Sequence, residues 1–160
     1  MKEKLLTGIG FDAHRLIKGR KLILGGMEIP YHKGLLGHSD GDVLSHAISD
    51  AILTAAGLND IGVLFPDTNP EYKNISSIII LNQVLKLITK KHLKLVNISA
   101  VLICEAPKLN PYFPEIKKNL ARVLGLTPEK IGLSAKTTET LIFNPRKEAI
   151  AALAISLLRG

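Results

Sequence analysis

The chain has 160 residues, of which 46% are hydrophobic and 4% aromatic, and its formal net charge is +7. This length and apolar content fit one domain with a packed core, and the only cysteine, Cys104, excludes an intramolecular disulfide and a multi-cysteine zinc site. No stretch approaches a membrane span or a signal peptide, so we expect a cytoplasmic protein that binds no membrane.

The positive charge has two interpretations. Lys86, Lys90 and Lys94 recur every four residues, which is typical of a solvated helix face. Nucleic-acid binding would also require aromatic side chains among the basic residues, and tryptophan is absent. We therefore expect no nucleic-acid partner, although the surplus charge can attract a small polyanionic substrate.

Apolar runs and the turn residues between them predict the elements of the first half. In chain order these are a strand over 5–12, a hairpin of strands over 21–24 and 27–30, a helix over 42–56, a loop over 61–70 and a helix over 75–91. Gly25-Gly26 is a hairpin signature. Asp42 can cap the first helix and Gly57 can end it.

The second half continues the alternation of strands and helices. In chain order it has a strand over 96–104, a proline-rich loop over 105–114, a helix over 114–124, a turn from Thr127, a strand over 131–136 and an apolar run over 149–158. Proline after Thr127 suits the first position of a short helical turn. The last run stays open, since its alanines favour a helix while its length and apolarity suit a buried strand.

Asp12, His14 and His46 form the most informative set of polar residues. Asp12 and His14 are two apart in a predicted strand, so their side chains lie on the same face, and His46 lies in the helix that follows Asp42. One carboxylate and two imidazoles are sufficient ligands for Zn²⁺ and leave a fourth position open. An Asp-x-His pair alone is weak support for a metal, so the other motifs matter.

Two further polar stretches suggest phosphate chemistry, and a third feature, Asp50, concerns the predicted metal ligands. The glycines of residues 37–42 allow close backbone approach, and the N–H groups at a helix start favour anions. Residues 136–140, Lys-Thr-Thr-Glu-Thr, suit a phosphate beside Mg²⁺, which usually takes one carboxylate and phosphate oxygens. Asp50 follows His46 by four, so it is either a hydrogen-bond partner of that imidazole or an ordinary exposed aspartate.

Taken in order, these motifs resemble the 2-C-methyl-D-erythritol 2,4-cyclodiphosphate synthase family. The resemblance runs from about residue 5 to 158, and its motifs are residues 10–14, 34–43, 60–62, 64–68, 106–108 and 137–139. The His-Ser-Asp-Gly-Asp block at 38–42, together with the upstream Asp-x-His, is the most diagnostic part.

The resemblance implies an α+β subunit with two layers: a four-stranded mixed sheet with helices on one face. It also implies that residues 149–158 form a strand and that the subunits assemble as a homotrimer with active sites between neighbours. Some relatives carry a cytidylyltransferase domain on the same chain. We expect a single synthase domain over residues 1–160 and hence the monofunctional form.

The implied reaction belongs to non-mevalonate isoprenoid biosynthesis. It converts 4-diphosphocytidyl-2-C-methyl-D-erythritol 2-phosphate to 2-C-methyl-D-erythritol 2,4-cyclodiphosphate and releases CMP. By the resemblance, Asp12, His14 and His46 hold Zn²⁺ (or Mn²⁺), and Glu139 holds Mg²⁺ or Mn²⁺ with the substrate diphosphate. The sequence does not determine which metal is physiological.

The resemblance also assigns residues around the substrate. His38 and Thr137 match positions that stabilise the transition state, and Ser39 matches one that holds the substrate phosphate. The other implied substrate contacts are Asp60, Ile61 and Gly62; Phe65, Pro66, Asp67, Thr68 and Asn69; Cys104, Glu105, Ala106, Pro107, Lys108, Leu109 and Asn110; and Lys136, Thr138, Phe143 and Arg146. Cys104 stands where a small residue is usual, so we expect a core or pocket-lining thiol and no nucleophile.

Residues 142–149 depart from the family pattern. The family commonly reads Gly-Phe-Thr-Gly-Arg-Gly-Glu-Gly, whereas this chain reads Ile-Phe-Asn-Pro-Arg-Lys-Glu-Ala. In relatives the segment lines a cavity on the trimer axis that can hold an isoprenoid diphosphate. Pro145 fixes φ and removes a donor, so the sequence leaves binding in that cavity open.

Two other functions fit parts of the pattern. A metal-dependent phosphohydrolase could use the same Asp-His-His ligands with an activated water, and it would release inorganic phosphate. A non-catalytic cytidine-nucleotide sensor would keep the nucleotide pocket and lose a metal ligand. All three ligands are present here, which favours an enzyme.

Overall fold

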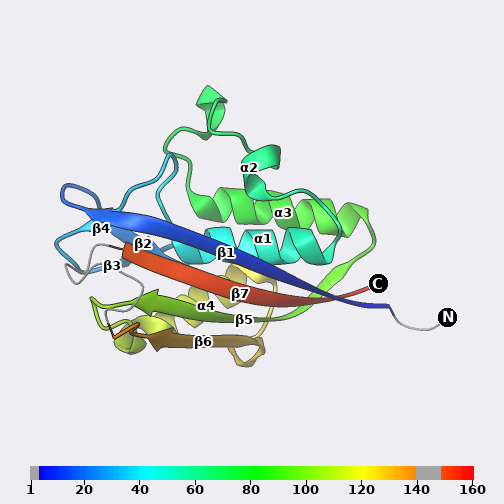
Figure 1. The fold of residues 1–160 in the computed structure, drawn as a ribbon. Coiled ribbons are helices and arrows are strands. Elements are labelled where there is room, and N and C mark those ends of the chain that lie inside the picture. The colour runs from blue at the N-terminus through cyan, green and yellow to red at the C-terminus, as the bar shows by residue number, and fades with distance from the viewer. Residues whose placement is uncertain (1–3, 140–148) are drawn as a thin grey trace.

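The computed structural model describes residues 4–139 and 149–160 and has two layers, a mixed sheet and a layer of helices (Figure 1). In the order of the sheet, the strands are β4 (Gly34–Leu35), β1 (Leu5–Ile17), β7 (Ala149–Arg159), β5 (Lys94–Cys104) and β6 (Ile131–Lys136). β5 and β6 are parallel, and the other neighbouring pairs are antiparallel. A separate hairpin pairs β2 (Leu22–Leu24) with β3 (Met27–Ile29).

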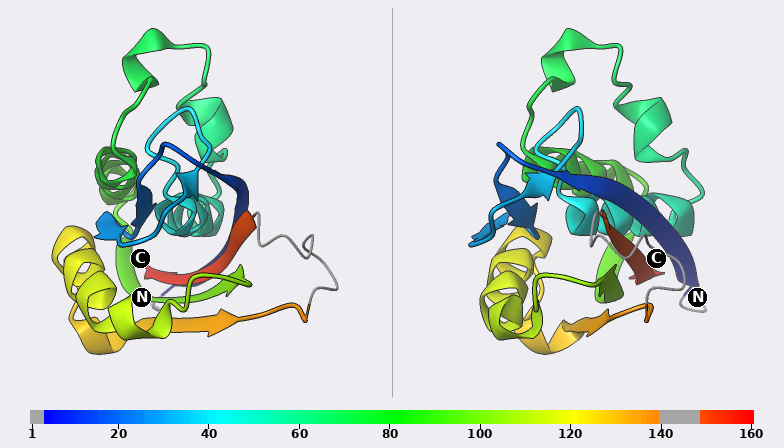
Figure 2. Two further views of the ribbon diagram at one scale, coloured as in Figure 1. Left: turned by 90° about the vertical axis from the view of Figure 1, so that its left-hand side faces the viewer. Right: turned by 60° about the vertical axis from the view of Figure 1, so that its left-hand side comes forward.

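The helices lie on one face of the sheet, which curves around α1 (Figure 2). The longer helices are α1 (Val43–Ala55), α3 (Ser77–Lys90) and α4 (Phe113–Leu124), and the short ones are α2 (Ile61–Leu64), η1 (Pro70–Tyr72), η2 (Asn110–Tyr112) and η3 (Pro128–Lys130). α1 packs on β1 and β7, while α3 packs on α1. No helix in the described parts of the chain is both long and apolar enough to cross a membrane.

Most predicted elements are present, including the strand over residues 149–158, which propensity alone left open. The predicted four-stranded sheet is wrong by one short strand, because β4 pairs with the end of β1 through Leu16 and Leu35. β1 also continues five residues beyond its predicted end at Asp12, since its side chains keep alternating between the two faces. The predicted loop over 61–70 begins with α2, whose first turn is capped by Asp60.

Two glycines of β1 determine how closely α1 approaches the sheet. A Cβ on Gly10 would lie 2.0 Å from the carbonyl oxygen of Ala47, and one on Gly8 would lie 2.1 Å from that of Ala51. Any side chain at these positions would therefore push α1 away. Because strand side chains alternate, Asp12 shares the face of Gly10, which points toward α1.

The opposite face of the sheet is uncovered in the subunit and exposes large apolar side chains of β1 and β7. Ile9, Phe11 and Ile155 are 58%, 59% and 51% exposed, respectively. Ile9 and Ile155 face each other across the β1–β7 pair. Large contiguous apolar surfaces on soluble chains usually mark an interaction site.

Candidate active site

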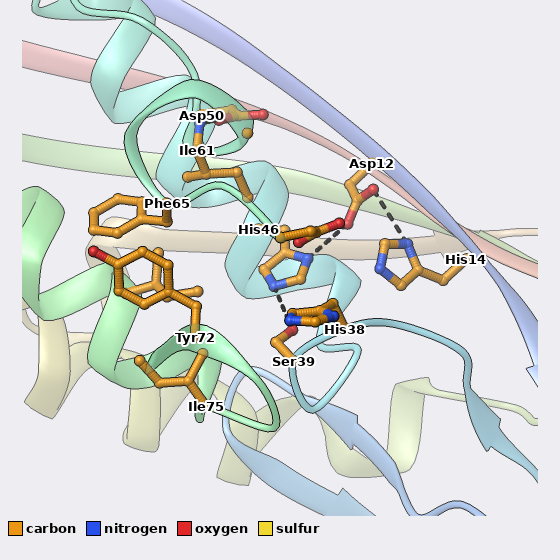
Figure 3. A pocket seen from close by; sticks show the side chains of 13 residues that line it. Asp12, His14, His38, Ser39, His46, Asp50, Ile61, Phe65, Tyr72 and Ile75 are labelled. Atoms are coloured by element: carbon orange, nitrogen blue, oxygen red, sulfur yellow. Dashed lines mark hydrogen bonds and ion pairs between the residues drawn. The ribbon is translucent and has the colours of Figure 1, made fainter. Parts of the chain in front are cut away.

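Asp12, His14 and His46 come together where β1 passes over α1 (Figure 3). One oxygen of Asp12, Oδ2, lies 2.9 Å from Nδ1 of His46, and the other, Oδ1, lies 3.2 Å from Nδ1 of His14. One potential ligand atom from each of the three residues lies within 4.8 Å of the other two. The sequence prediction that these residues form one cluster is confirmed.

The cluster keeps its carboxylate ionised. Burial alone would raise the pKa of Asp12, but hydrogen bonds from His14 and His46 outweigh it and lower the pKa to about 2. The same hydrogen bond to Asp12 raises the pKa of His14. The ionised carboxylate and the two imidazoles beside it together form a set of metal ligands.

A buried carboxylate fixes the start of α1 and so the position of His46. Asp42 is fully buried, and its oxygens accept the N–H groups of Gly25, Gly26 and Ser45 at 2.7–3.0 Å. It also accepts the hydroxyl hydrogen of Ser45 at 2.7 Å. Burial raises the pKa of Asp42, and these donors oppose that effect. The predicted helix cap therefore also ties the β2–β3 turn to the site.

The surroundings of the cluster fit a bound metal ion. One carboxylate and two imidazoles are the donor chemistry that Zn²⁺ and related divalent ions accept. Gly37 keeps space beside the His14 ring, since a Cβ there would lie 3.1 Å from its Nε2. The donor set therefore fits a divalent metal ion, as expected from the sequence.

A cavity of about 210 Å³ opens next to the three ligands. Its lining residues are Asp12, His14, His38, Ser39, His46, Asp50, Ile61, Gly62, Phe65, Asp67, Tyr72, Ile75 and Ile80. Nε2 of His38 is buried and has no hydrogen-bond partner within residues 4–139 and 149–160. Buried polar atoms are nearly always paired, so His38 is suited to bind a ligand group in this cavity.

The wall of the cavity matches the predicted substrate contacts only in part. Phe65 and Asp67 line it, and the Phe65 ring packs edge-on against Tyr72 at 5.6 Å between centroids. Asp60 instead caps α2 by accepting the N–H of Val63, and Asn69 caps η1. Pro66 and Thr68 are also absent from the lining. The sequence did not identify Tyr72, Ile75 or Ile80, because nothing distinguishes them from ordinary core residues.

A second group of predicted residues lies around the end of β6. Oε1 of Glu105 accepts both the N–H and the hydroxyl of Thr138 at 2.8 Å. Next to it, the hydroxyl of Thr137 donates to Glu139 at 2.7 Å. Glu139 is exposed and has a φ of +51°, which is uncommon for a residue with a side chain. Glu105 thus holds the segment 136–139 against the loop that follows β5.

Within that loop, side chains differ in their access to solvent. Lys108 and Asn110 are exposed, and Ala106 and Pro107 are half-buried. Leu109 is 1% exposed, so its side chain belongs to the core and only its main chain can contact a substrate. Cys104 is buried, its thiol donates to the Pro107 carbonyl at 3.5 Å, and burial raises its pKa to about 11. This fits the expected core thiol.

The two groups are separate within one chain. None of residues 104–110 or 136–139 lines the cavity beside His46. β7 and β5 lie between β1 and β6, which puts the strands about 14 Å apart at the usual spacing. The predicted residues Phe143 and Arg146, with the departing segment around Pro145, lie outside the described residues.

The open question about Asp50 is answered by its contact with α2. Oδ1 of Asp50 accepts the N–H of Ile61 at 2.8 Å, and Nδ1 of His46 faces Asp12. Asp50 lines the cavity and fixes the start of α2, but no hydrogen bond joins it to His46. Burial is the main reason that its pKa is raised.

Comparison with known proteins places the chain in a family. The sequence profile of the YgbB family matches residues 5–159. The chain belongs to the YgbB family. It is 53% identical over 152 residues to a 2-C-methyl-D-erythritol 2,4-cyclodiphosphate synthase of Caldicellulosiruptor bescii, covering 95% of this chain and 97% of that protein.

Solved structures of YgbB relatives have the same fold. A structure named 2C-methyl-D-erythritol-2,4-cyclodiphosphate synthase, in a form bound to CDP, is 41% identical with a TM-score of 0.88, over 95% of this chain and 99% of that one. The bifunctional IspDF of Campylobacter jejuni is 40% identical with a TM-score of 0.94. That match covers 99% of this chain and 43% of the longer bifunctional one. The expected α+β class and family are confirmed.

Proposed function

We propose that the protein is a 2-C-methyl-D-erythritol 2,4-cyclodiphosphate synthase of isoprenoid precursor biosynthesis. It converts 4-diphosphocytidyl-2-C-methyl-D-erythritol 2-phosphate to the 2,4-cyclodiphosphate and releases CMP. The observation that carries the proposal is the cluster of Asp12, His14 and His46 beside a cavity, in a chain that matches a synthase of this name over nearly its whole length.

The reaction needs no nucleophile from the protein. The 2-phosphate oxygen of the substrate attacks its own β-phosphorus, the bond from that phosphorus to the CMP oxygen breaks, and CMP leaves. Catalysis then consists of positioning and charge stabilisation. His38, with its unpaired buried nitrogen, suits donation to the phosphate oxygens, and Ser39 lines the same cavity.

Metal ions belong to this proposal. A Zn²⁺ (or Mn²⁺) ion held by Asp12, His14 and His46 would supply Lewis-acid stabilisation of phosphate charge. Glu139 would hold the Mg²⁺ or Mn²⁺ that accompanies a diphosphate, since Mg²⁺ is commonly bound by one carboxylate together with phosphate oxygens. The exposed position of Glu139 leaves its carboxylate accessible to such an ion.

We further propose a homotrimer whose active sites are shared between subunits. The metal cluster and the Thr137–Glu139 group are both needed, yet they lie on strands separated by two others in one chain. A neighbouring copy can bring its Thr137–Glu139 group to this cavity. The apolar sheet face with Ile9, Phe11 and Ile155 offers the surface for such an assembly. We place the enzyme in the cytoplasm, which suits its free, buried thiol.

Product analysis tests the reaction. Purified protein is incubated with the cytidine diphosphate substrate, Mg²⁺ and Zn²⁺, and the products are identified by mass spectrometry. We expect the cyclic diphosphate and CMP in equal amounts, and neither with Asp12→Ala. Release of inorganic phosphate without a cyclic product would instead support the phosphohydrolase, and binding of CDP without turnover would support the nucleotide sensor.

A further inference from the structure

The ring nitrogen of His46 that points away from Asp12 contacts two buried serines. Nε2 of His46 lies 2.8 Å from the hydroxyl oxygen of Ser77 and 3.1 Å from that of Ser39. Ser77 is the first residue of α3, 31 positions further along the chain, and it is fully buried. Figure 3 shows Ser39 beneath the His46 ring, on the side opposite Asp12.

A carboxylate determines where the Ser77 hydroxyl hydrogen points. Oδ1 of Asp40 is hydrogen-bonded to the Ser77 hydroxyl and also accepts the N–H of Asp42 at 3.1 Å. Oδ2 of Asp40 accepts the N–H of Ser77 at 3.0 Å. An ionised carboxylate can only accept, so the Ser77 hydroxyl must donate its hydrogen to Asp40.

This direction decides the protonation of the His46 ring. Since the only hydrogen of the Ser77 hydroxyl points to Asp40, Ser77 Oγ can only accept from His46. Nε2 must then carry the hydrogen in the 2.8 Å contact. In this structure the other ring nitrogen, Nδ1, donates to Oδ2 of Asp12 at 2.9 Å. A metal ion held by Asp12 and His46 would take the place of that hydrogen at Nδ1.

Ser39 does not fix the ring in the same way. Its oxygen accepts the N–H of Gly41 at 3.3 Å, and its distance to the Ser77 hydroxyl is 3.5 Å. In the described parts of the chain, no carboxylate is hydrogen-bonded to the Ser39 hydroxyl. Its hydrogen can therefore point either to His46 or into the cavity, so Ser39 is compatible with either tautomer.

We propose that Asp40 and Ser77 are positioning residues for the metal site, which together keep the hydrogen of His46 on Nε2 and leave Nδ1 to the metal. The inference deepens the proposed function and rests on metal binding at Asp12, His14 and His46. Groups that hold a ligating imidazole in this way typically change metal affinity by tenfold to a hundredfold. Asp40 and Ser77 also join the 37–42 loop to the start of α3.

Zinc affinity of Ser77→Ala tests the proposal without measuring catalysis. The apparent Kd for Zn²⁺ is measured by competition with a chromophoric chelator for the wild type, Ser77→Ala and Ser49→Ala. Ser49 is the matched control, because it is equally buried and its hydroxyl has no hydrogen-bond partner among the described residues. We expect Ser77→Ala to weaken zinc binding by about tenfold to a hundredfold and Ser49→Ala to leave it unchanged.

Nitrogen-15 spectra of the histidine rings provide a second readout in the same samples. In the zinc-loaded wild type and in Ser49→Ala, we expect an Nε2–H signal for His46 that exchanges slowly with water. In Ser77→Ala this signal should broaden or disappear. Asp40→Asn should change both readouts in the same direction. The asparagine amide has one acceptor oxygen, so it cannot accept hydrogen bonds from all three groups that donate to Asp40: the N–H of Asp42 and the N–H and hydroxyl of Ser77.

The possible outcomes separate this inference from the proposed function. Failure of the wild type to bind zinc or manganese at this cluster would overturn the metal site itself and with it the inference. Equal zinc affinity and an unchanged Nε2–H signal in folded Ser77→Ala would overturn the role of Ser77 alone. If Ser77→Ala does not fold, the same two measurements on Asp40→Asn decide.

Discussion

At Asp12, one carboxylate contacts two imidazoles, and the ionisation of Asp12 and of His14 makes the stability of the fold depend on pH. The folded-state pKa of Asp12 is lowered from 3.8 to about 2, so its stabilising effect is present above about pH 4 and is lost as the pH falls toward 2. The pKa of His14 is raised above 6.5, so its effect is present below that pH and is lost as the pH rises through the raised value.

We therefore expect this pair to stabilise the metal-free protein most between about pH 4 and 6.5. Urea unfolding of the wild type and of His14→Gln, in the presence of a chelator, measures the difference in unfolding free energy across the pH range. That difference should be largest inside the window and shrink on both sides. A difference that does not vary with pH would show that the pair contributes nothing by ionisation.

The thiol of Cys104 should be unreactive near neutral pH. Its pKa of about 11 leaves roughly one thiolate in a thousand molecules at pH 8, and the side chain is buried. Alkylation by iodoacetamide should be far slower than that of a free cysteine and should accelerate as the pH approaches 11. Protein unfolded in urea is the control and should react at the ordinary rate. Fast labelling of the native chain would contradict the burial and raised pKa of this thiol.

Residue patterns identified some of the site and missed the rest for a physical reason. Asp12 and His14 obey the alternation of a strand, and His46 lies in a well-capped helix, so local rules placed each residue on its element. The family resemblance, and no local rule, brought His46 together with Asp12, which is 34 positions away. Ser77 is 31 residues from His46, and no periodic rule relates them. Asp50 obeys the helical i, i+4 rule with His46, but its carboxylate contacts α2 instead.

At the scale of elements, the packing of α1 against β1 is the critical contact. A Cβ at Gly10 would lie 2.0 Å from a backbone oxygen and 2.5 Å from a backbone nitrogen of α1. Because backbone atoms cannot rotate away as a side chain can, the helix must shift. That shift would also move His46 relative to Asp12, so stability and metal binding should suffer together.

Gly10→Ala should lower the unfolding free energy by about 3 kcal/mol or more, the upper range for overpacking. Gly132→Ala in β6 is the control, because the atom nearest to its Cβ would be the Ser99 hydroxyl oxygen, at 3.1 Å, and no backbone atom would lie closer than 3.7 Å. This substitution should cost less than about 1 kcal/mol. Chemical unfolding and zinc titration of both variants measure the two effects. Equal stability of the two variants would show that α1 can move without cost.

The elements themselves were predicted where local signals suffice. Asp42 was enough to predict the start of α1, and Gly25-Gly26 was enough to predict the β2–β3 turn. β7 remained open from its residues because apolar side chains occupy both of its faces, so its sequence shows no alternation that separates it from a buried helix. β4 was missed because two residues are too short for any pattern.

For the whole molecule, the proposed function requires two separated groups to act on one substrate. Asp12 lies on β1 and Glu139 follows β6, with β7 and β5 between them. In a closed ring of three copies, each metal cluster can face the Glu139 group of a neighbour. A site of this kind requires two chains, and each chain then contributes to two sites.

Subunit mixing tests this arrangement. Asp12→Ala chains keep Glu139, and Glu139→Gln chains keep the metal cluster, so a mixed trimer contains some intact sites. Random assembly from equal amounts should restore about one quarter of the sites in a cyclic trimer, although each variant alone is inactive. Mixing Asp12→Ala with His46→Ala is the control and should restore nothing, because both changes damage the same group. Recovery equal in both mixtures, or full activity in a monomer by light scattering, would contradict the shared site.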